Sequence, residues 1–276
     1  MKIIDSHLHF WKYDTVRHHW IGEEMGGIRR DFLPCDLAGV FLSNDISGGV
    51  AVQAEQTEEE TSFLLGLAGE SDWIRGVVGW VDLQSPVVEG KLEYYREFPV
   101  LKGFRHVLQG EVQRDLCLEK DFLRGIGLLE RFGYTYDILV LPDQLKFLPE
   151  FAGKFPGLRF VLDHMAKPMI RDGEIELWKA DIQRVALYEN VYCKVSGMVT
   201  EADLRGWKEA DFRPYLDVVV EAFGMDRLMY GSDWPVCLAG GSYFSVLGLV
   251  SSYFKGFSKE EQQRFFSGNA EAFYGL

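Results

Sequence analysis

Two histidines near the N-terminus are spaced so that they could act together. His7 and His9 lie in a run of β-forming residues, IIDSHLHF, at positions 3–10. Residues two apart in a strand point to the same side of a sheet, so both imidazoles should face one way. Two imidazoles placed like this can bind one cation together or donate to one carbonyl oxygen. The pair therefore predicts a reaction centre at the end of the first strand.

Further polar side chains lie at or just beyond the ends of other apolar runs. They are Gln53, Arg105, His106, His164, Lys194, Asp233 and Trp234. Asp233 could be a metal ligand, a general base that activates water, or both. The guanidinium of Arg105 is a rigid fork of donors for carboxylate or hydroxyl oxygens. Burying Lys194 alone on an apolar strand would be costly, so we expect its ammonium either to pair with an acid or to face the site.

Eight short runs rich in Val, Ile, Leu, Tyr and Phe would position these side chains. They span 3–10, 48–55, 74–83, 100–108, 134–141, 158–164, 190–197 and 226–233. Most are continuously apolar, which is typical of strands buried on both faces of a parallel sheet. Helical patterns lie between them, at 58–71, 120–132, 145–155, 179–187, 212–223 and 258–273. A repeat of roughly 32 residues predicts an α/β fold, a distorted (β/α)8 barrel that forms a single domain over residues 1–276.

Such a barrel carries its functional residues at the carboxyl ends of the strands, where the polar side chains above are found. The long segment 11–34 would lie on the same face, because it follows the first strand. The alternative architecture is an open doubly wound sheet. That fold favours a glycine-rich phosphate loop after the first strand, and the sequence has none there.

The composition excludes several classes of partner. With 29 Lys and Arg against 42 Asp and Glu, the net charge of −13 disfavours nucleic acid and anionic membranes. No apolar run is long enough to span a membrane, and the first residues do not read as a signal peptide. Four scattered cysteines indicate reduced thiols rather than disulfides. We therefore expect a cytoplasmic protein that acts on a small molecule; oligomeric state cannot be inferred from the sequence.

Several short motifs together are similar to those of a known family. They are DSHLHFW (5–11), GWVDL (79–83), GFRH (103–106), DHMAKP (163–168), KVSG (194–197), YGSDWP (230–235) and GNAEAFYGL (268–276). The chain resembles the amidohydrolase superfamily, and more narrowly its amidohydrolase 2 branch. That branch includes lactonases of the L-fuconolactonase and L-rhamnonolactonase kind and the 2-pyrone-4,6-dicarboxylate lactonases. The resemblance covers essentially the whole chain.

The resemblance implies a hydrolase that opens a small lactone, with a sugar aldonolactone favoured. Asp233 would activate the attacking water, His164 would stabilise the oxyanion, and the His7/His9 side would polarise the carbonyl. The substrate would be bound by Arg105, His106, Gln53, Lys194 and Trp234, together with the tryptophans of the 11–34 segment.

Members of the superfamily with two metals carry a Lys after strand four and a His after strand five. This sequence has Arg105-His106 and Tyr136-Asp137 at those places. The resemblance therefore implies at most one divalent ion, expected to be zinc, held by His7, His9 and Asp233, with His164 nearby. A metal-free site is equally consistent with the branch.

Two other functions stay open at this point. Related barrels with the same histidine pair and aspartate remove carboxyl groups from aromatic acids with the help of a metal, so a decarboxylase is the first alternative. The second alternative is a binding protein that has the barrel fold but does not catalyse a reaction. Such a protein should lack one or more of the polar strand-end residues, and none of them is missing here.

Overall fold

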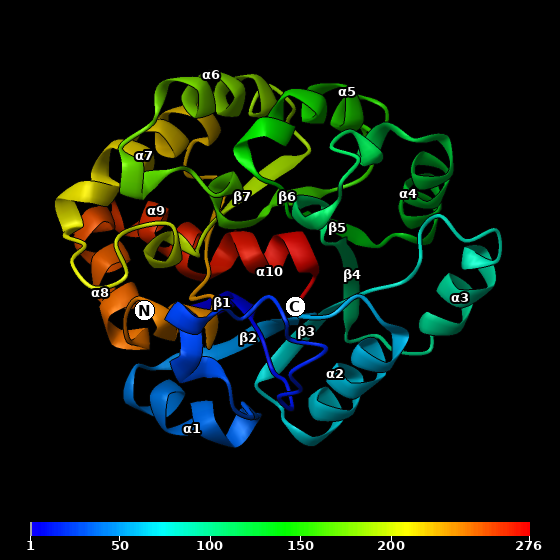
Figure 1. Ribbon diagram of the computed structural model, residues 1–276, viewed down its shortest axis with the longest axis horizontal. Helices are drawn as coiled ribbons and strands as arrows, with labels where there is room; N and C mark the ends of the chain where they lie inside the picture. Colours follow the sequence, from blue (N-terminus) through cyan, green and yellow to red (C-terminus); the bar gives the residue numbers. More distant parts are fainter. Residues whose placement is uncertain (1) are drawn as a thin grey trace.

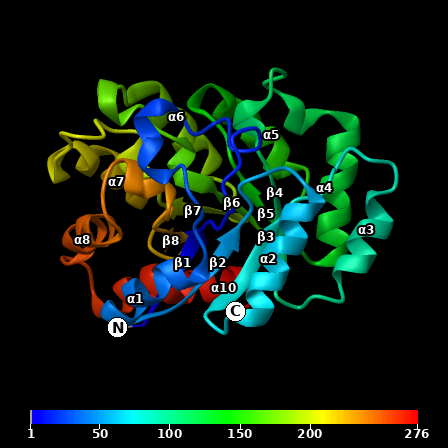
Figure 2. The ribbon, with the colours of Figure 1, turned by 60° about the horizontal axis from the view of Figure 1, so that its bottom comes forward.

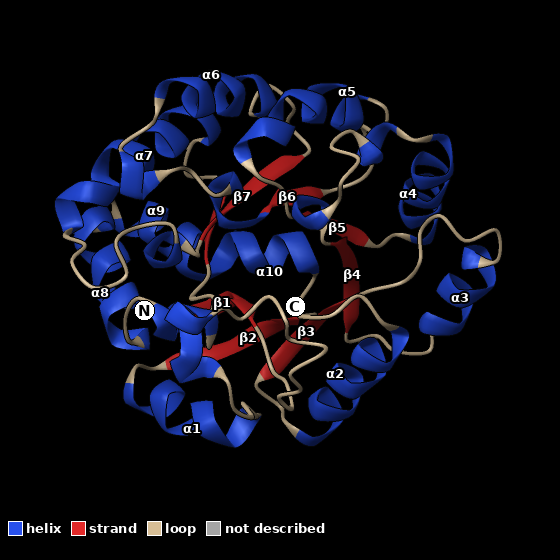
Figure 3. Cartoon of the chain, in the orientation of Figure 1, coloured by secondary structure: helices blue, strands red, loops and turns tan. Residues whose placement is uncertain are grey.

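The computed structural model of the protein describes residues 2–276. Within that range, eight parallel strands pair in chain order into one sheet, and most of the helices lie around it (Figures 1 and 3). The strands are β1 Ile3–Leu8, β2 Ile46–Val52, β3 Ile74–Gly79, β4 Leu101–His106, β5 Thr135–Ile138, β6 Phe160–Leu162, β7 Val191–Val195 and β8 Leu228–Tyr230. Seven of them lie inside their predicted runs and β2 starts two residues before its run, so the α/β barrel is confirmed.

The two ends of the sheet meet just beyond β8. Leu8 forms a parallel bridge with Trp234, and the His9 amide donates to the Trp234 carbonyl at 2.7 Å. The Ser232 amide also donates to the Asp5 carboxylate at 2.9 Å. These contacts place the end of β1 directly beside the segment that carries Asp233.

The helices were predicted less completely than the strands. They are α1 Pro34–Ser43, α2 Glu58–Glu70, α3 Val88–Tyr95, α4 Lys120–Phe132, α5 Leu148–Gly153, α6 Glu176–Val185, α7 Glu209–Phe223, α8 Tyr243–Phe254, α9 Lys259–Gln263 and α10 Asn269–Tyr274. The prediction for α4 is confirmed at both ends: its apolar face is regular, and Gly133 closes it with a left-handed φ of 78°. The predicted helix 258–273 is interrupted, because a π-helical turn at Arg264–Gly268 separates α9 from α10.

One end of the barrel is closed by α10. Figure 1 shows this helix in red across the middle of the ring of strands, and Figure 2 shows it at one end of the strands, away from the loops that follow them. Phe273 and Tyr274 pack against buried strand residues that include Ile4, Val161 and Met229. The opposite end is therefore the one that is free to hold a ligand. Across residues 2–276, no helix is both long and apolar enough to cross a membrane.

Candidate active site

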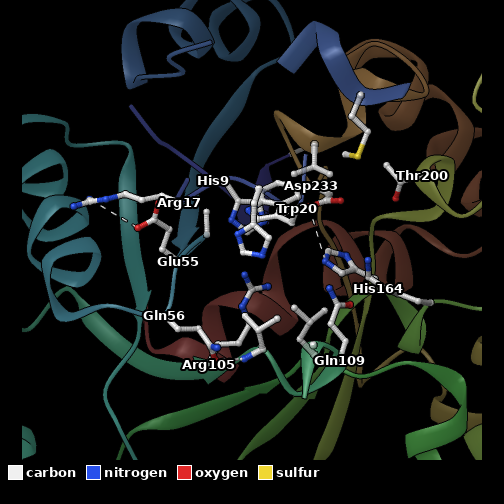
Figure 4. Close-up of a pocket in the computed structure, with 18 of the residues that line it drawn as sticks. His9, Arg17, Trp20, Glu55, Gln56, Arg105, Gln109, His164, Thr200 and Asp233 are labelled. Carbon is white, nitrogen blue, oxygen red and sulfur yellow. Dashed lines mark hydrogen bonds and ion pairs between the residues drawn. The ribbon is translucent and has the colours of Figure 1, made fainter. Parts of the chain in front are cut away.

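A cavity of about 710 Å³ opens at the free end of the barrel (Figure 4). Its lining includes His9, Arg17, His19, Trp20, Glu55, Gln56, Arg105, Gln109, Glu111, His164, Lys167, Thr200, Glu201 and Asp233. Most of these residues come from strand ends or from the loops that follow them. The segment 11–34 also contributes, as the sequence predicts from its position after the first strand.

Three histidines and one carboxylate converge beside this cavity. We call His7, His9, His164 and Asp233 the open cluster. The Nε2 atoms of His7 and His9 are 3.1 Å apart, and that of His9 lies 3.4 Å from Asp233 Oδ1. The Nε2 atoms of His7 and His164 are each 3.9 Å from the same oxygen. The four residues that the sequence singles out as catalytic are thus brought together; their roles remain proposals.

Neighbouring groups orient the imidazoles of the open cluster. His9 Nδ1 lies 2.8 Å from the Val52 carbonyl, which can only accept, so the ring proton is on Nδ1 and the Nε2 lone pair is free. His164 Nδ1 lies 2.9 Å from Ser196 Oγ, and a hydroxyl can donate or accept there. Gly197 packs against the His164 ring so closely that a Cβ would lie 2.6 Å from Nδ1. A larger residue at position 197 would displace the histidine.

Burial and neighbouring side chains together set the protonation states in the open cluster. Burial lowers the pKa of His164 to about 4, and it holds the pKa of His7 well below its usual range. Burial alone would raise the pKa of Asp233, but the nearby His164, His9 and His7 outweigh it and bring that pKa well below its usual range. At neutral pH, His7 and His164 are therefore neutral and Asp233 is ionised.

This donor set fits a divalent metal ion. Tetrahedral ligands of zinc, at bond lengths of 2.0–2.1 Å, are about 3.3 Å apart. Donor atoms of His7, His164 and Asp233 all lie within 4.8 Å of one another, and His9 Nε2 is beside them. For His7 Nε2 to bind an ion, Nδ1 must carry the proton, and Asp163 Oδ1 lies 3.3 Å from it as an acceptor. Lys194 Nζ, 3.1 Å from the same Nδ1, must then direct its hydrogens to Asp137 and Asp163. The predicted ligands His7, His9 and Asp233 can thus hold one ion, with His164 as a further ligand.

The backbone after β6 is strained where it presents His164. Residues 164–167 all have positive φ, between 51° and 56°. For residues with a Cβ, this left-handed conformation costs about 1–2 kcal/mol each. The Lys167 amide donates to the His164 carbonyl at 2.8 Å, and Trp178 Nε1 donates to the Met165 carbonyl at 2.7 Å. Asp233 also has a φ of 59°. Two members of the open cluster, His164 and Asp233, thus have strained backbones, as residues of functional sites often do.

A second group of charged residues lies beneath the open cluster, away from the cavity. We call Asp137, Asp163 and Lys194, with the Nδ1 side of His7, the closed cluster. Lys194 Nζ lies 2.5 Å from Asp137 Oδ2, 3.0 Å from Asp163 Oδ1 and 3.1 Å from His7 Nδ1. Of the two placements expected for Lys194, the structure shows pairing with acids.

This placement corrects the expectation that Lys194 binds substrate, because its side chain is fully buried between the acids. Three other predicted substrate contacts also lie behind the cavity wall. Gln53 donates to the Arg105 carbonyl at 3.1 Å, and Trp234 packs against Phe10 and Phe32. Neighbouring residues at a strand end point to opposite sides, so His106 turns away from Arg105 and pairs with Glu111 at 2.8 Å. Arg105 itself lines the cavity and donates to Asp163 Oδ2 at 2.9 Å.

Sequence reasoning missed much of the wall. Glu55 is buried there, and its Oε1 makes no hydrogen bond within residues 2–276. Arg17, 3.9 Å from Glu55, and Trp20 come from the long segment after β1 (Figure 4). Position just after a strand was a usable signal for Glu55. Trp20 is one of the loop tryptophans expected at the substrate, whereas only the path of the loop reveals Arg17.

Comparisons with known proteins agree with this geometry. The model of the Amidohydrolase family matches residues 4–276. An L-fucono-1,5-lactonase of Burkholderia multivorans is 39% identical over 99% of this chain and 96% of its own length. A second L-fucono-1,5-lactonase, from Burkholderia ambifaria, is 35% identical over 99% of this chain and 95% of its own. A crystal structure of an amidohydrolase from Burkholderia multivorans with bound zinc is 39% identical, covers 100% of both chains and has a TM-score of 0.96.

Proposed function

The chain belongs to the amidohydrolase family, and on that basis we propose that it is a lactonase, a carboxylic-ester hydrolase that opens a neutral sugar lactone. The observation that carries this proposal is the open cluster: an ionised Asp233 beside three imidazoles at the floor of a cavity. The full-length similarity to two proteins named L-fucono-1,5-lactonases supports the same chemistry. These relatives favour hydrolysis over decarboxylation and over a role without catalysis.

In the proposed reaction, Asp233 removes a proton from water as the water oxygen bonds to the lactone carbonyl carbon. The bond from that carbon to the ring oxygen then breaks. Protonated Asp233 returns its proton to the departing alkoxide, and the product is an open hydroxy acid. The lowered pKa of Asp233 keeps the carboxylate ionised at neutral pH, which is the form that a base requires.

The histidines would stabilise the negative charge that develops on the carbonyl oxygen. If Ser196 donates to His164 Nδ1, the proton of His164 is on Nε2 and can be donated to that oxygen. His7 Nε2 and His9 Nε2 lie 3.9 Å and 3.4 Å from Asp233 Oδ1. Because His9 Nε2 carries no proton, His9 would polarise the carbonyl through a bound ion rather than directly. A divalent ion held by His7, His9 and Asp233 would supply Lewis-acid polarisation of the same carbonyl when bound.

The wall of the cavity favours a neutral, hydroxyl-rich substrate. Glu55, Glu111 and Glu201 are carboxylates on this wall, and Lys167 is paired with Glu201 at 3.2 Å. Arg105 is likewise engaged by Asp163. Sugar hydroxyls can donate to carboxylates, whereas the two carboxylates of a pyrone dicarboxylate would be repelled by them. We therefore propose L-fucono-1,5-lactone or a lactone of similar shape as substrate.

The proposal is tested by following acid release with a pH indicator. The panel contains L-fuconolactone, L-rhamnonolactone and other aldonolactones, together with 2-pyrone-4,6-dicarboxylate. Each rate is measured against a blank and against Asp233→Asn, because some lactones open without an enzyme. We expect hydrolysis of at least one aldonolactone and a lower rate for the dicarboxylate. If no lactone is hydrolysed faster than in the blank, the proposal that the protein is a lactonase is refuted. If the dicarboxylate is hydrolysed fastest, the proposal of a neutral substrate is refuted.

We also propose a cytoplasmic location. Cys117, Cys193 and Cys237 are buried as free thiols, and Cys35 is exposed and free. Such thiols suit a reducing compartment. Cell fractionation with an antibody against the protein would test this, and recovery outside the cytoplasmic fraction would contradict it.

A further inference from the structure

The closed cluster resembles a cation site in its donor set. Donor atoms of His7, Asp137 and Asp163 lie within 4.8 Å of one another, and all three residues are buried. The same description applies to His7, His164 and Asp233 of the open cluster. One imidazole belongs to both groups, through Nε2 on the cavity side and Nδ1 beneath. Judged by donor type and spacing alone, either group could bind a divalent ion.

The two groups differ in how a neighbouring cation contacts their donors. In the open cluster, Arg105 Nη1 lies 3.3 Å from one donor, His7 Nε2. In the closed cluster, the Lys194 ammonium is within 3.1 Å of an atom of each of His7, Asp137 and Asp163. Its side chain is fully buried, so it cannot swing out to solvent without opening the sheet. We propose that Lys194 is a resident cation: its ammonium occupies this second cation site permanently and limits the chain to one exchangeable divalent ion.

The charges of the buried layer agree with this inference. The carboxylates of Asp137 and Asp163 are balanced by the ammonium of Lys194 and by the guanidinium of Arg105, which donates to Asp163 at 2.9 Å. A divalent ion added to this balanced group would leave uncompensated positive charge in a dry interior, which is costly. Removing the ammonium alone would leave one carboxylate without a counter-charge, and an entering cation would then be favoured.

A second ion needs space as well as a favourable charge. Two variants at position 194 distinguish these two requirements. Lys194→Met removes the charge and keeps most of the volume. Lys194→Ala removes the charge and also opens a cavity between the two carboxylates. Asp137 Oδ1 already has no hydrogen-bond partner among residues 2–276, so an oxygen is available to a new ligand.

The experiment counts zinc ions per chain. Wild type, Lys194→Ala and Lys194→Met are incubated with zinc chloride, desalted and examined by native mass spectrometry, with circular dichroism as the test of folding. We expect folded Lys194→Ala to retain one zinc ion more than the wild type, and Lys194→Met to retain the same number as the wild type. An unchanged count in folded Lys194→Ala would overturn the proposal, as would an equal gain in Lys194→Met. This count does not depend on lactonase activity.

A second measurement avoids the risk that Lys194→Ala does not fold. Asp137→Asn removes one carboxylate of the closed cluster while Lys194 stays in place. If Lys194 already fills the site, the zinc count of Asp137→Asn equals that of the wild type. Loss of one ion from Asp137→Asn would show that the wild-type closed cluster binds zinc and would overturn the proposal.

Discussion

The open and closed clusters are built from the same kinds of side chain but have different surroundings. Both use buried histidine and aspartate, and both use His7. The open cluster faces a cavity of about 710 Å³, whereas an ammonium lies among the donors of the closed cluster. The comparison teaches that donor type and spacing do not by themselves define a reactive site. What lies between the donors decides whether a ligand can enter.

The largest effect is expected from Asp233→Asn in the open cluster. The amide keeps the shape of the carboxylate but cannot accept the proton of the attacking water, so kcat should fall by roughly 10³-fold or more. Its melting temperature should stay close to that of the wild type. Steady-state kinetics and a thermal melt test this, and activity near the wild-type level would refute the role of Asp233 as base.

Removal of metal should act on the open cluster alone. Dialysis against a strong chelator is expected to lower kcat by at least about tenfold, and one equivalent of zinc should restore it, because one ion fits His7, His9 and Asp233. Metal analysis of the dialysed protein is the control. Full activity in a sample shown to be free of metal would establish the metal-free form of the reaction instead.

Tyr274→Phe should affect stability rather than catalysis, because it touches only the closed cluster. The Tyr274 hydroxyl donates to Asp137 Oδ2 at 2.8 Å in the buried layer. Losing a buried hydrogen bond to a charged group costs about 1.5–3 kcal/mol. The free energy of unfolding measured in urea should therefore fall by that amount. The matched control is Tyr253→Phe, which removes a similar but exposed bond to Asp217 at 2.7 Å. An equal loss of stability in both variants would contradict the special role of the buried layer.

The smallest effect is expected at the cavity wall. Glu55 is a buried carboxylate with an unbonded oxygen, as is Asp137, but it faces the cavity. Glu55→Gln should raise KM for a sugar lactone by roughly tenfold, about 1.4 kcal/mol, and change kcat little, because a weaker acceptor remains. Glu58→Gln, at an exposed pair with Lys91, serves as the control. A fall in kcat with unchanged KM would place Glu55 in the chemical step instead.

Sequence reasoning succeeded where a pattern repeats within a few residues. The strands were found because double-sided burial requires continuous apolar runs, and His7, His9, His164 and Asp233 were found because they lie at or just beyond strand ends. It missed α1, α3 and α8. The segment YFSVLGLVSSYF of α8 is apolar on nearly every side, so it has no polar face to mark a helix.

Other features depend on contacts between distant parts of the chain. The depth of Lys194 is set by Asp137 on β5 and Asp163 just after β6, and the sequence left pairing and exposure both open. The left-handed turn at 164–167 has no glycine to announce it and is held by tertiary contacts such as that of Trp178. Arg17 reaches the cavity through the path of a long segment, which no local pattern predicts.

The meeting of β1 with the segment after β8 has a consequence for the order of folding. The bond from the Ser232 amide to Asp5 joins residues 227 positions apart, and the His9 amide bonds to Trp234 nearby. Contacts this distant in sequence carry a large loop-closure entropy and form slowly, whereas the helices form from local contacts. During refolding from urea, helical circular dichroism should therefore recover first. Enzymatic activity should return later, because the site is complete only when the two edges of the sheet have joined.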